Sequence, residues 1–362
     1  MGAVTVWSGR VGGRLAPEVW EFLRGDDAEL LPYDLQATLL HAERLHAAGI
    51  LDDAELAEVA EKLAAIRLYV ADSCAEADAA LTSFALAILA RAEAEAETAM
   101  PGYTHLQRAQ PITVGHHLLA WVEMLERDRA RFAFAAAQAA PSPLGAGALA
   151  GSTLELPAPP NAMRNTIDAV ADRDFALDYL YAAAALFVHL SRIGEELVLW
   201  TTSEFGFARL PEDAATGSSI MPQKLNPDVA ELARGKAGTA IGRLTGLLAT
   251  VKSLPLAYDR DLQEDKPPVF AARRDVAGAL GALTVLIAGL ELDTARLAAA
   301  ASDPLLLATD AAEALVAEGV PFRDAHEQVA AEVRAGTFEA PPARARAFDV
   351  AAAVAAAKER WS

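Results

Sequence analysis

The chain has 362 residues, 53% of them hydrophobic, so it holds enough apolar material for a sizeable core and for two or three domains. Its 50 acidic and 31 basic residues give a formal net charge of -19, and the resulting repulsion argues against nucleic acid and anionic membranes as partners. An anionic substrate must therefore be held by local cations.

The single cysteine, Cys74, leaves no intrachain disulfide and fits a reducing compartment. We interpret it as a small, buried, apolar residue. The first ten residues lack the basic stretch and apolar run of a secretory signal. The longest apolar stretch, around 183–188, is too short to span a bilayer. We therefore expect a cytoplasmic protein.

Alanine is abundant and apolar residues recur at intervals of three and four, which predicts an all-α fold with no convincing strand series. In chain order, the expected helices cover residues 34–48, 53–66, 76–97, 113–139, 175–205, 228–253, 269–290 and 309–317. Several of them exceed the globular average of about eleven to twelve residues. Long helices that are apolar on several faces indicate a bundle, whose remaining apolar faces partner subunits would cover.

Changes in this pattern predict three parts. A shortened N-terminal helical domain covers 1–66, a central long-helix bundle covers 67–300, and a C-terminal helical domain covers 301–362. Proline and glycine clusters interrupt the helices, and these breaks are where chemistry can lie on loops.

The most informative break is the string GSSIMPQKLNPD at residues 217–228. Serine is a poor base unless its alkoxide is stabilised, so chemistry at Ser218 needs donors such as Lys224, backbone amides or a helix N-terminus. Asn226 can cap the helix that Pro227 starts. The alternative is an ordinary inter-helix loop whose serines cap a helix.

This string resembles the signature loop of the fumarase/aspartase superfamily. The string MPGYTHLQRAQP at 100–111 resembles the form that another superfamily loop takes in argininosuccinate lyases. Further matches are PSPLGAGALAG at 141–151, DAVADRDF at 168–175, EFGFARL at 204–210 and LPLAYDRDLQEDK at 254–266. The resemblance to argininosuccinate lyase covers most of the chain from Arg67 onward.

The resemblance implies a lyase that removes a Cβ proton from a succinyl group, stabilises an aci-carboxylate and releases fumarate. Ser218 would be the catalytic base, and His105 would assist on the acid side, with Glu231 orienting its imidazole. Lys224 and Asn226 would hold the substrate carboxylate.

Six further positions correspond to substrate contacts in argininosuccinate lyases, namely Thr104, Gln107, Arg173, Tyr258, Gln263 and Lys266. Taken singly, each has a simpler interpretation. His105 would be a structural hydrogen-bonding residue, Arg173 and Lys266 would be solvated charges, and Tyr258 would pack at an interface.

The resemblance implies neither a metal nor an organic cofactor. It implies a small-molecule substrate and a homotetramer in which each active site lies at the junction of three subunits. His116 and His117 are adjacent rather than four residues apart, so we interpret them as packing or interface residues and not as metal ligands.

Three stretches depart from the family pattern. The substrate-binding loop expected between Ile66 and Arg67 is absent, the polar opening segment is replaced around 11–17, and prolines replace a small helix at 154–164. Three explanations fit. The sequence lacks stretches that the full polypeptide contains, the protein acts on a different succinyl compound, or it is a non-catalytic structural paralogue.

Overall fold

The computed structural model describes residues 28–49, 63–217, 220–221, 223–342 and 348–362. Its contacts divide the chain into two units. The first unit comprises Met1–Tyr69, Pro141–Asp172 and Ser253–Lys266, and the second comprises Val70–Ala140, Arg173–Lys252 and Pro267–Ser362.

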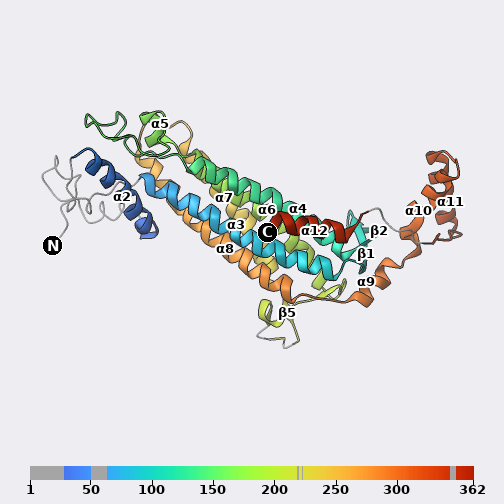
Figure 1. Ribbon diagram of the computed structural model, residues 1–362. Helices are drawn as coiled ribbons and strands as arrows, with labels where there is room; N and C mark the ends of the chain where they lie inside the picture. Colours follow the sequence, from blue (N-terminus) through green and yellow to red (C-terminus); the bar gives the residue numbers. More distant parts are fainter. Residues whose placement is uncertain (1–27, 50–62, 218–219, 222, 343–347) are drawn as a thin grey trace. The chain divides into compact units, whose positions relative to one another are not determined.

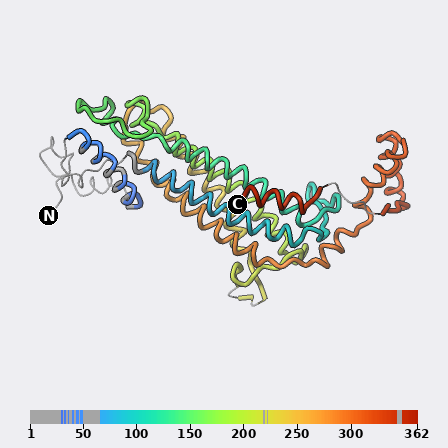
Figure 2. Tube along the Cα trace, in the orientation of Figure 1, coloured from blue at the N-terminus to red at the C-terminus, as the bar shows by residue number. Residues whose placement is uncertain are grey.

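The second unit is built on long helices, as Figures 1 and 2 show. These helices are α3 (Leu63–Ala94), α4 (Val114–Ala139), α6 (Asp174–Thr201), α7 (Asp228–Val251) and α8 (Lys266–Gly289). The first residues of α3 and the first residue of α8 belong to the first unit. Helices dominate the described chain, which confirms the all-α prediction.

Helix α6 packs against both α4 and α7. Along α6, fully buried side chains recur at three- and four-residue intervals, as at Tyr179, Ala183, Leu186 and Leu190. Each large apolar side chain buried in this way stabilises the fold by about 1.5–3 kcal/mol. The periodicity of the sequence therefore becomes the packing of the bundle.

Ion pairs join neighbouring long helices. The Asp275 carboxylate on α8 accepts a hydrogen bond of 2.6 Å from Arg243 on α7, and it also pairs with Lys236. Burial alone would raise the pKa of Asp275, but the hydrogen bonds and charges of these two cations lower it below its usual value. Arg273 on α8 binds Asp72 of α3 at 2.9 Å.

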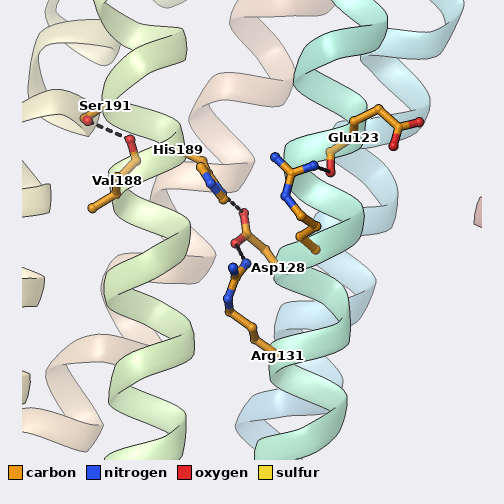
Figure 3. A network of polar contacts seen from close by, with 7 residues as sticks. Glu123, Asp128, Arg131, Val188, His189 and Ser191 are labelled. Carbon is orange, nitrogen blue, oxygen red and sulfur yellow. Dashed lines mark hydrogen bonds and ion pairs between the residues drawn. The ribbon is translucent and has the colours of Figure 1, made fainter.

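Figure 3 shows a polar network between α4 and α6. The Asp128 carboxylate, which is fully buried, accepts hydrogen bonds from His189 Nδ1 at 2.7 Å and from Arg131 at 2.9 Å. Burial raises the pKa of Asp128, and the two partners offset this only in part. A charged group inside the bundle is tolerated because both carboxylate oxygens have donors.

Two antiparallel hairpins of the second unit correct the prediction that the chain has no strands. Strands β1 (Ala99–Thr104) and β2 (Gln107–Thr113) pair with Thr104 opposite Gln107. The short strands β4 (Thr216–Gly217) and β5 (Leu225–Asn226) pair with Thr216 opposite Asn226. A third pair joins β3 (Ala208–Arg209) to β6 (Glu291–Leu292).

The start of α7 also differs from the prediction. Pro227 occupies the capping position, no side chain caps the helix, and Asn226 lies in β5 instead. Helix α8 starts at Lys266, earlier than predicted, because Pro267 and Pro268 lie in its first turn, where a missing N–H costs no intrahelical hydrogen bond. Thr113 caps α4, as its position at the helix start allows.

The described residues also contain shorter elements. They are η2 (Ala28–Leu30), α2 (Leu31–Ala47), α5 (Thr166–Ala171), η4 (Glu212–Ala214), η5 (Arg260–Asp265), α9 (Thr294–Ala301), η6 (Pro304–Leu307), α10 (Ala308–Ala317), α11 (Phe322–Ala335) and α12 (Val350–Trp361). Most of the helix expected at 53–66 lies outside the described residues. No helix forms at 154–164, in the described chain, as its prolines predict.

The three-domain division stays a prediction. Helix α3 runs through Ile66 without a break, and the contacts divide the chain just after it, between Tyr69 and Val70. Ala300 lies inside α9, within the second unit.

The segment Ile66–Ala94 of α3 is long and apolar enough to cross a membrane by length and composition alone. Its side chains pack in the bundle, where Leu81, Phe84 and Ile88 are fully buried, so we interpret α3 as a core helix. Cys74 on the same helix is buried, and burial raises the pKa of its thiol to about 12, which agrees with its interpretation as an apolar residue.

We predict that Gly194→Ala destabilises the protein by about 1–3 kcal/mol, because the added methyl group overpacks the α6–α7 contact. A Cβ at Gly194 would lie 2.5 Å from the Ala230 carbonyl oxygen. The matched control is Gly278→Ala on α8, where a Cβ would meet nothing within 4 Å and alanine is the better helix former. Thermal unfolding compares the two variants, and equal melting temperatures would contradict a tight α6–α7 approach.

Candidate active site

His105 lies at the tip of the β1–β2 hairpin. His105 and Leu106 are the two turn residues, with φ of 55° and 57°, both in the left-handed region. Such two-residue hairpins favour Asn and Gly, and a left-handed conformation costs other residues roughly 1–2 kcal/mol each. Thr104, His105 and Gln107 are all exposed. The hairpin thus presents an imidazole on a strained turn, as functional sites often do.

Of the signature string, Gly217 lies in β4, and Leu225 and Asn226 lie in β5. Ser218 lies outside the described residues. Lys224 is exposed, and its backbone N–H donates to the Met221 carbonyl at 3.1 Å, which closes part of the tip. The Thr216 hydroxyl donates to the carboxylate of Asp228, the first residue of α7, so the hairpin is tied to the start of that helix.

Glu231 occupies the first turn of α7 and is exposed. Its carboxylate lies 3.8 Å from Arg234, which also pairs with Glu195 of α6. Within the described chain no ion pair joins Glu231 to His105. The pairing of Glu231 with His105 stays a prediction.

Tyr258, Gln263 and Lys266 form a connected chain of hydrogen bonds in the first unit. The Lys266 ammonium donates to Gln263 Oε1 at 2.6 Å, and Gln263 Nε2 donates to the Tyr258 hydroxyl at 2.6 Å. Lys266 also lies 3.8 Å from Asp265, whose side chain is buried. Three residues predicted to contact substrate are thus brought together by their own contacts.

Arg173 is the residue before α6 and is only 5% exposed. The Lys266 side chain is 11% exposed. The alternative interpretation of both as solvated surface charges is therefore wrong. Of the two adjacent histidines, His116 stacks on Phe348 at 4.0 Å between ring centroids, and His117 donates to Glu196 at 2.8 Å and contacts the rings of Trp121 and Trp200.

Comparison with known proteins identifies the family to which the chain belongs. Residues 63–242 match the lyase family model, and residues 305–342 match the model of the argininosuccinate lyase C-terminal region. The chain is 46% identical over 390 residues to the argininosuccinate lyase of Frankia casuarinae, in an alignment that covers 90% of this chain and 83% of that protein. The chain belongs to the argininosuccinate lyase family.

A second family member, the argininosuccinate lyase of an Anaeromyxobacter species, is 52% identical over 286 residues. That match covers 77% of this chain and 61% of the relative, so the chain spans under two thirds of its length. Among solved structures, EDDS lyase in complex with formate gives a TM-score of 0.74 at 27% identity, covering 91% of this chain and 78% of that one. An EDDS lyase variant with bound fumarate gives a TM-score of 0.73 at 26% identity, covering 92% and 80%.

The Frankia alignment also bears on the predicted shortening. Its 390 positions exceed the 362 residues of this chain, so it must include positions at which this chain has no residue opposite the Frankia protein. The predicted absence of family segments is in line with this excess.

Sequence reasoning gave no role to the residues that support the histidine turn. The ring of Tyr103, on β1, lies 5.7 Å from that of Phe205 and 6.4 Å from that of Phe207, which follow α6. Both phenylalanines belong to the EFGFARL string that resembles the family, and this string was the available signal.

We predict that Leu106→Asn raises the free energy of unfolding by about 1 kcal/mol, because asparagine tolerates the left-handed conformation that strains leucine. The control is Leu154→Asn, since Leu154 is 51% exposed, against 67% for Leu106, but has ordinary backbone geometry. Thermal unfolding of both variants gives the comparison. An equal or larger gain at Leu154 would show that the turn is not strained.

Proposed function

We propose that this protein cleaves argininosuccinate by β-elimination into fumarate and arginine, as a carbon-nitrogen lyase of arginine biosynthesis. The observation that carries the proposal is family membership together with the intact signature string that contains Ser218, Lys224 and Asn226. The exposed, strained turn at His105 supports it.

In the proposed reaction, Ser218 removes the Cβ proton and the electron pair moves toward the neighbouring carboxylate, which becomes an aci-carboxylate. Collapse of this intermediate forms the carbon-carbon double bond and breaks the carbon-nitrogen bond. Arginine leaves with a proton supplied on the side of His105, whose imidazole Glu231 orients. Lys224 and Asn226 hold the substrate carboxylate and stabilise the negative charge that develops on it.

The remaining predicted contacts recognise the substrate. Arg173 supplies a buried positive charge, and Tyr258, Gln263 and Lys266 supply a connected polar chain. Thr104 and Gln107 flank the histidine turn. These roles are proposals that rest on the matching strings of the sequence.

We further propose a cytoplasmic homotetramer with active sites shared between subunits. Helix α7 supports this because Leu232, Ile241 and Leu248 remain 46–60% exposed on it. Gly235, Gly238 and other α7 glycines would meet nothing within 4 Å if they carried a Cβ, so another helix can approach closely. A shared site also accounts for the lack of an ion pair between Glu231 and His105 within the described chain.

The internal shortening favours a second candidate, a lyase that acts on a different succinyl compound. Loss of a substrate-binding segment would relax recognition of the amine half while the proton-abstraction residues remain. An ultraviolet assay of fumarate release from argininosuccinate separates the two, together with an intact-mass measurement of the native protein. Absence of turnover in a protein whose mass matches the printed sequence would favour the second candidate or a structural paralogue.

We predict that Ser218→Ala and His105→Asn each lower kcat for fumarate release by a factor of about 100 or more, because each removes a proton-transfer group. Both variants should keep the oligomeric state and melting temperature of the unmodified protein. Light scattering and thermal unfolding check this. Undiminished turnover in Ser218→Ala would refute its role as base, and unfolding of His105→Asn would support a structural histidine.

Mixed oligomers test the shared site. When the two inactive variants are unfolded together and refolded, random assortment should return roughly a quarter of the unmodified turnover, since some sites then draw both intact residues from different chains. Each variant refolded alone is the control. A mixture that stays as inactive as its components would mean that Ser218 and His105 act from the same chain.

A further inference from the structure

One side chain of α9 binds the turn that follows α6, in addition to backbone hydrogen bonds such as that from Gly206 N–H to the Thr202 carbonyl at 2.7 Å. Arg296 Nη2 donates to the carbonyl oxygens of Ser203 at 3.0 Å and Glu204 at 2.8 Å. The Arg296 backbone N–H is bound in turn by the Asp293 side chain, which caps α9. The guanidinium therefore belongs to a residue at the capped start of α9, and it donates hydrogen bonds to two neighbouring carbonyls.

Gly206 leaves the space that the Arg296 guanidinium occupies. Its φ is 57°, and a Cβ on it would lie 2.9 Å from Arg296 Cζ and 3.0 Å from Nε and Nη1. The flat face of the guanidinium thus lies against the bare backbone of Gly206. A lysine could donate a hydrogen bond here, but it has no planar group to lie against this glycine.

The turn that Arg296 binds is followed by, and includes, aromatic residues that contact the histidine hairpin. Phe205 and Phe207 lie edge to face at 5.4 Å, and both contact Tyr103. Tyr103 is two residues before His105 on β1, and α9 itself packs against β1. One layer of rings separates the arginine-bound turn from the turn that presents the imidazole.

A cavity of about 710 Å³ borders these rings. It is lined by Tyr103, Leu106, Gln107, Phe205, Phe207 and Arg296, among others. Because the rings are not packed on that side, their position depends more strongly on the turn that carries the two phenylalanines.

We propose that Arg296 is a positioning residue for the histidine turn. By fixing residues 203–206 it fixes Phe205 and Phe207, these fix Tyr103, and Tyr103 sets where His105 stands in the assembled active site. This inference rests on the proposed function for its catalytic readout, but the contacts that carry it do not depend on the substrate.

The test compares Arg296→Met and Arg296→Lys with Arg323→Met, a control at an exposed arginine of α11. We expect Arg296→Met to lower kcat by about 10- to 100-fold with KM changed by less than about threefold, because a small misplacement of a catalytic group acts mainly on the chemical step. Arg296→Lys should recover part of that loss, and Arg323→Met should match the unmodified protein.

A double-mutant cycle of Arg296 and Gly206 provides a second test of the proposal. Gly206→Ala should reproduce the loss of Arg296→Met by displacing the guanidinium, and the double variant should lose no more than either single one, because both break the same contact. Fully additive losses, or a kcat for Arg296→Met equal to that of the control, would overturn the proposal.

Hydrogen exchange of the backbone amides at 103–108 keeps the test independent of substrate. Arg296→Met should speed their exchange by about tenfold relative to Arg323→Met, since the hairpin loses support from the turn. If the protein releases no fumarate from argininosuccinate but exchange speeds up, the proposed function fails and the positioning role stands. Unchanged exchange would sink the positioning role whatever the substrate.

Discussion

The backbone contact between α6 and α7 is the constraint on which the proposed chemistry depends. Gly194 lets the two helices approach until the Ala230 carbonyl occupies the space that a side chain would need. Ala230 is the residue before Glu231, so this contact fixes the helix turn that carries the proposed partner of His105. The same turn receives the Thr216 hydrogen bond that ties the signature hairpin to α7.

The long helices and the β1–β2 turn differ in how they are stabilised. The long helices are stabilised by buried apolar side chains and by ion pairs such as that of Arg243 with Asp275. His105, to which we propose a chemical role, lies instead on a short turn and adopts a conformation that its side chain disfavours. Strain in such a turn persists because the surrounding structure holds it.

Much of the fold could be predicted from sequence because helical periodicity is local. The predicted helix at 113–139 differs from α4 by a single residue, and that at 309–317 differs from α10 by one. The hairpins were missed because β4 and β5 are two residues long, and because pairing across a turn leaves no periodic signal. The start of α3 was missed because its apolar residues continue through the expected boundary at Ile66.

The candidate site could be predicted only where the local sequence matched a known string. Matching strings pointed to His105, Lys224 and Asn226. No pattern could show that Arg173 is buried, or that Arg296 binds two carbonyls that lie 93 and 92 residues before it. Such roles arise from contacts between distant segments. Asp128 is a similar case, since its spacing from Leu125 and Phe132 marks a buried face but does not name its partner His189.

The deep burial of Cys74 gives the protein an intrinsic reporter of its own opening. A thiol with a pKa near 12 holds almost no thiolate at neutral pH, and alkylating reagents react with the thiolate. Labelling at this cysteine is therefore expected to increase when α3 moves away from its neighbours and exposes the thiol. The labelling rate then reports how often the bundle opens locally around Cys74, without any engineered probe.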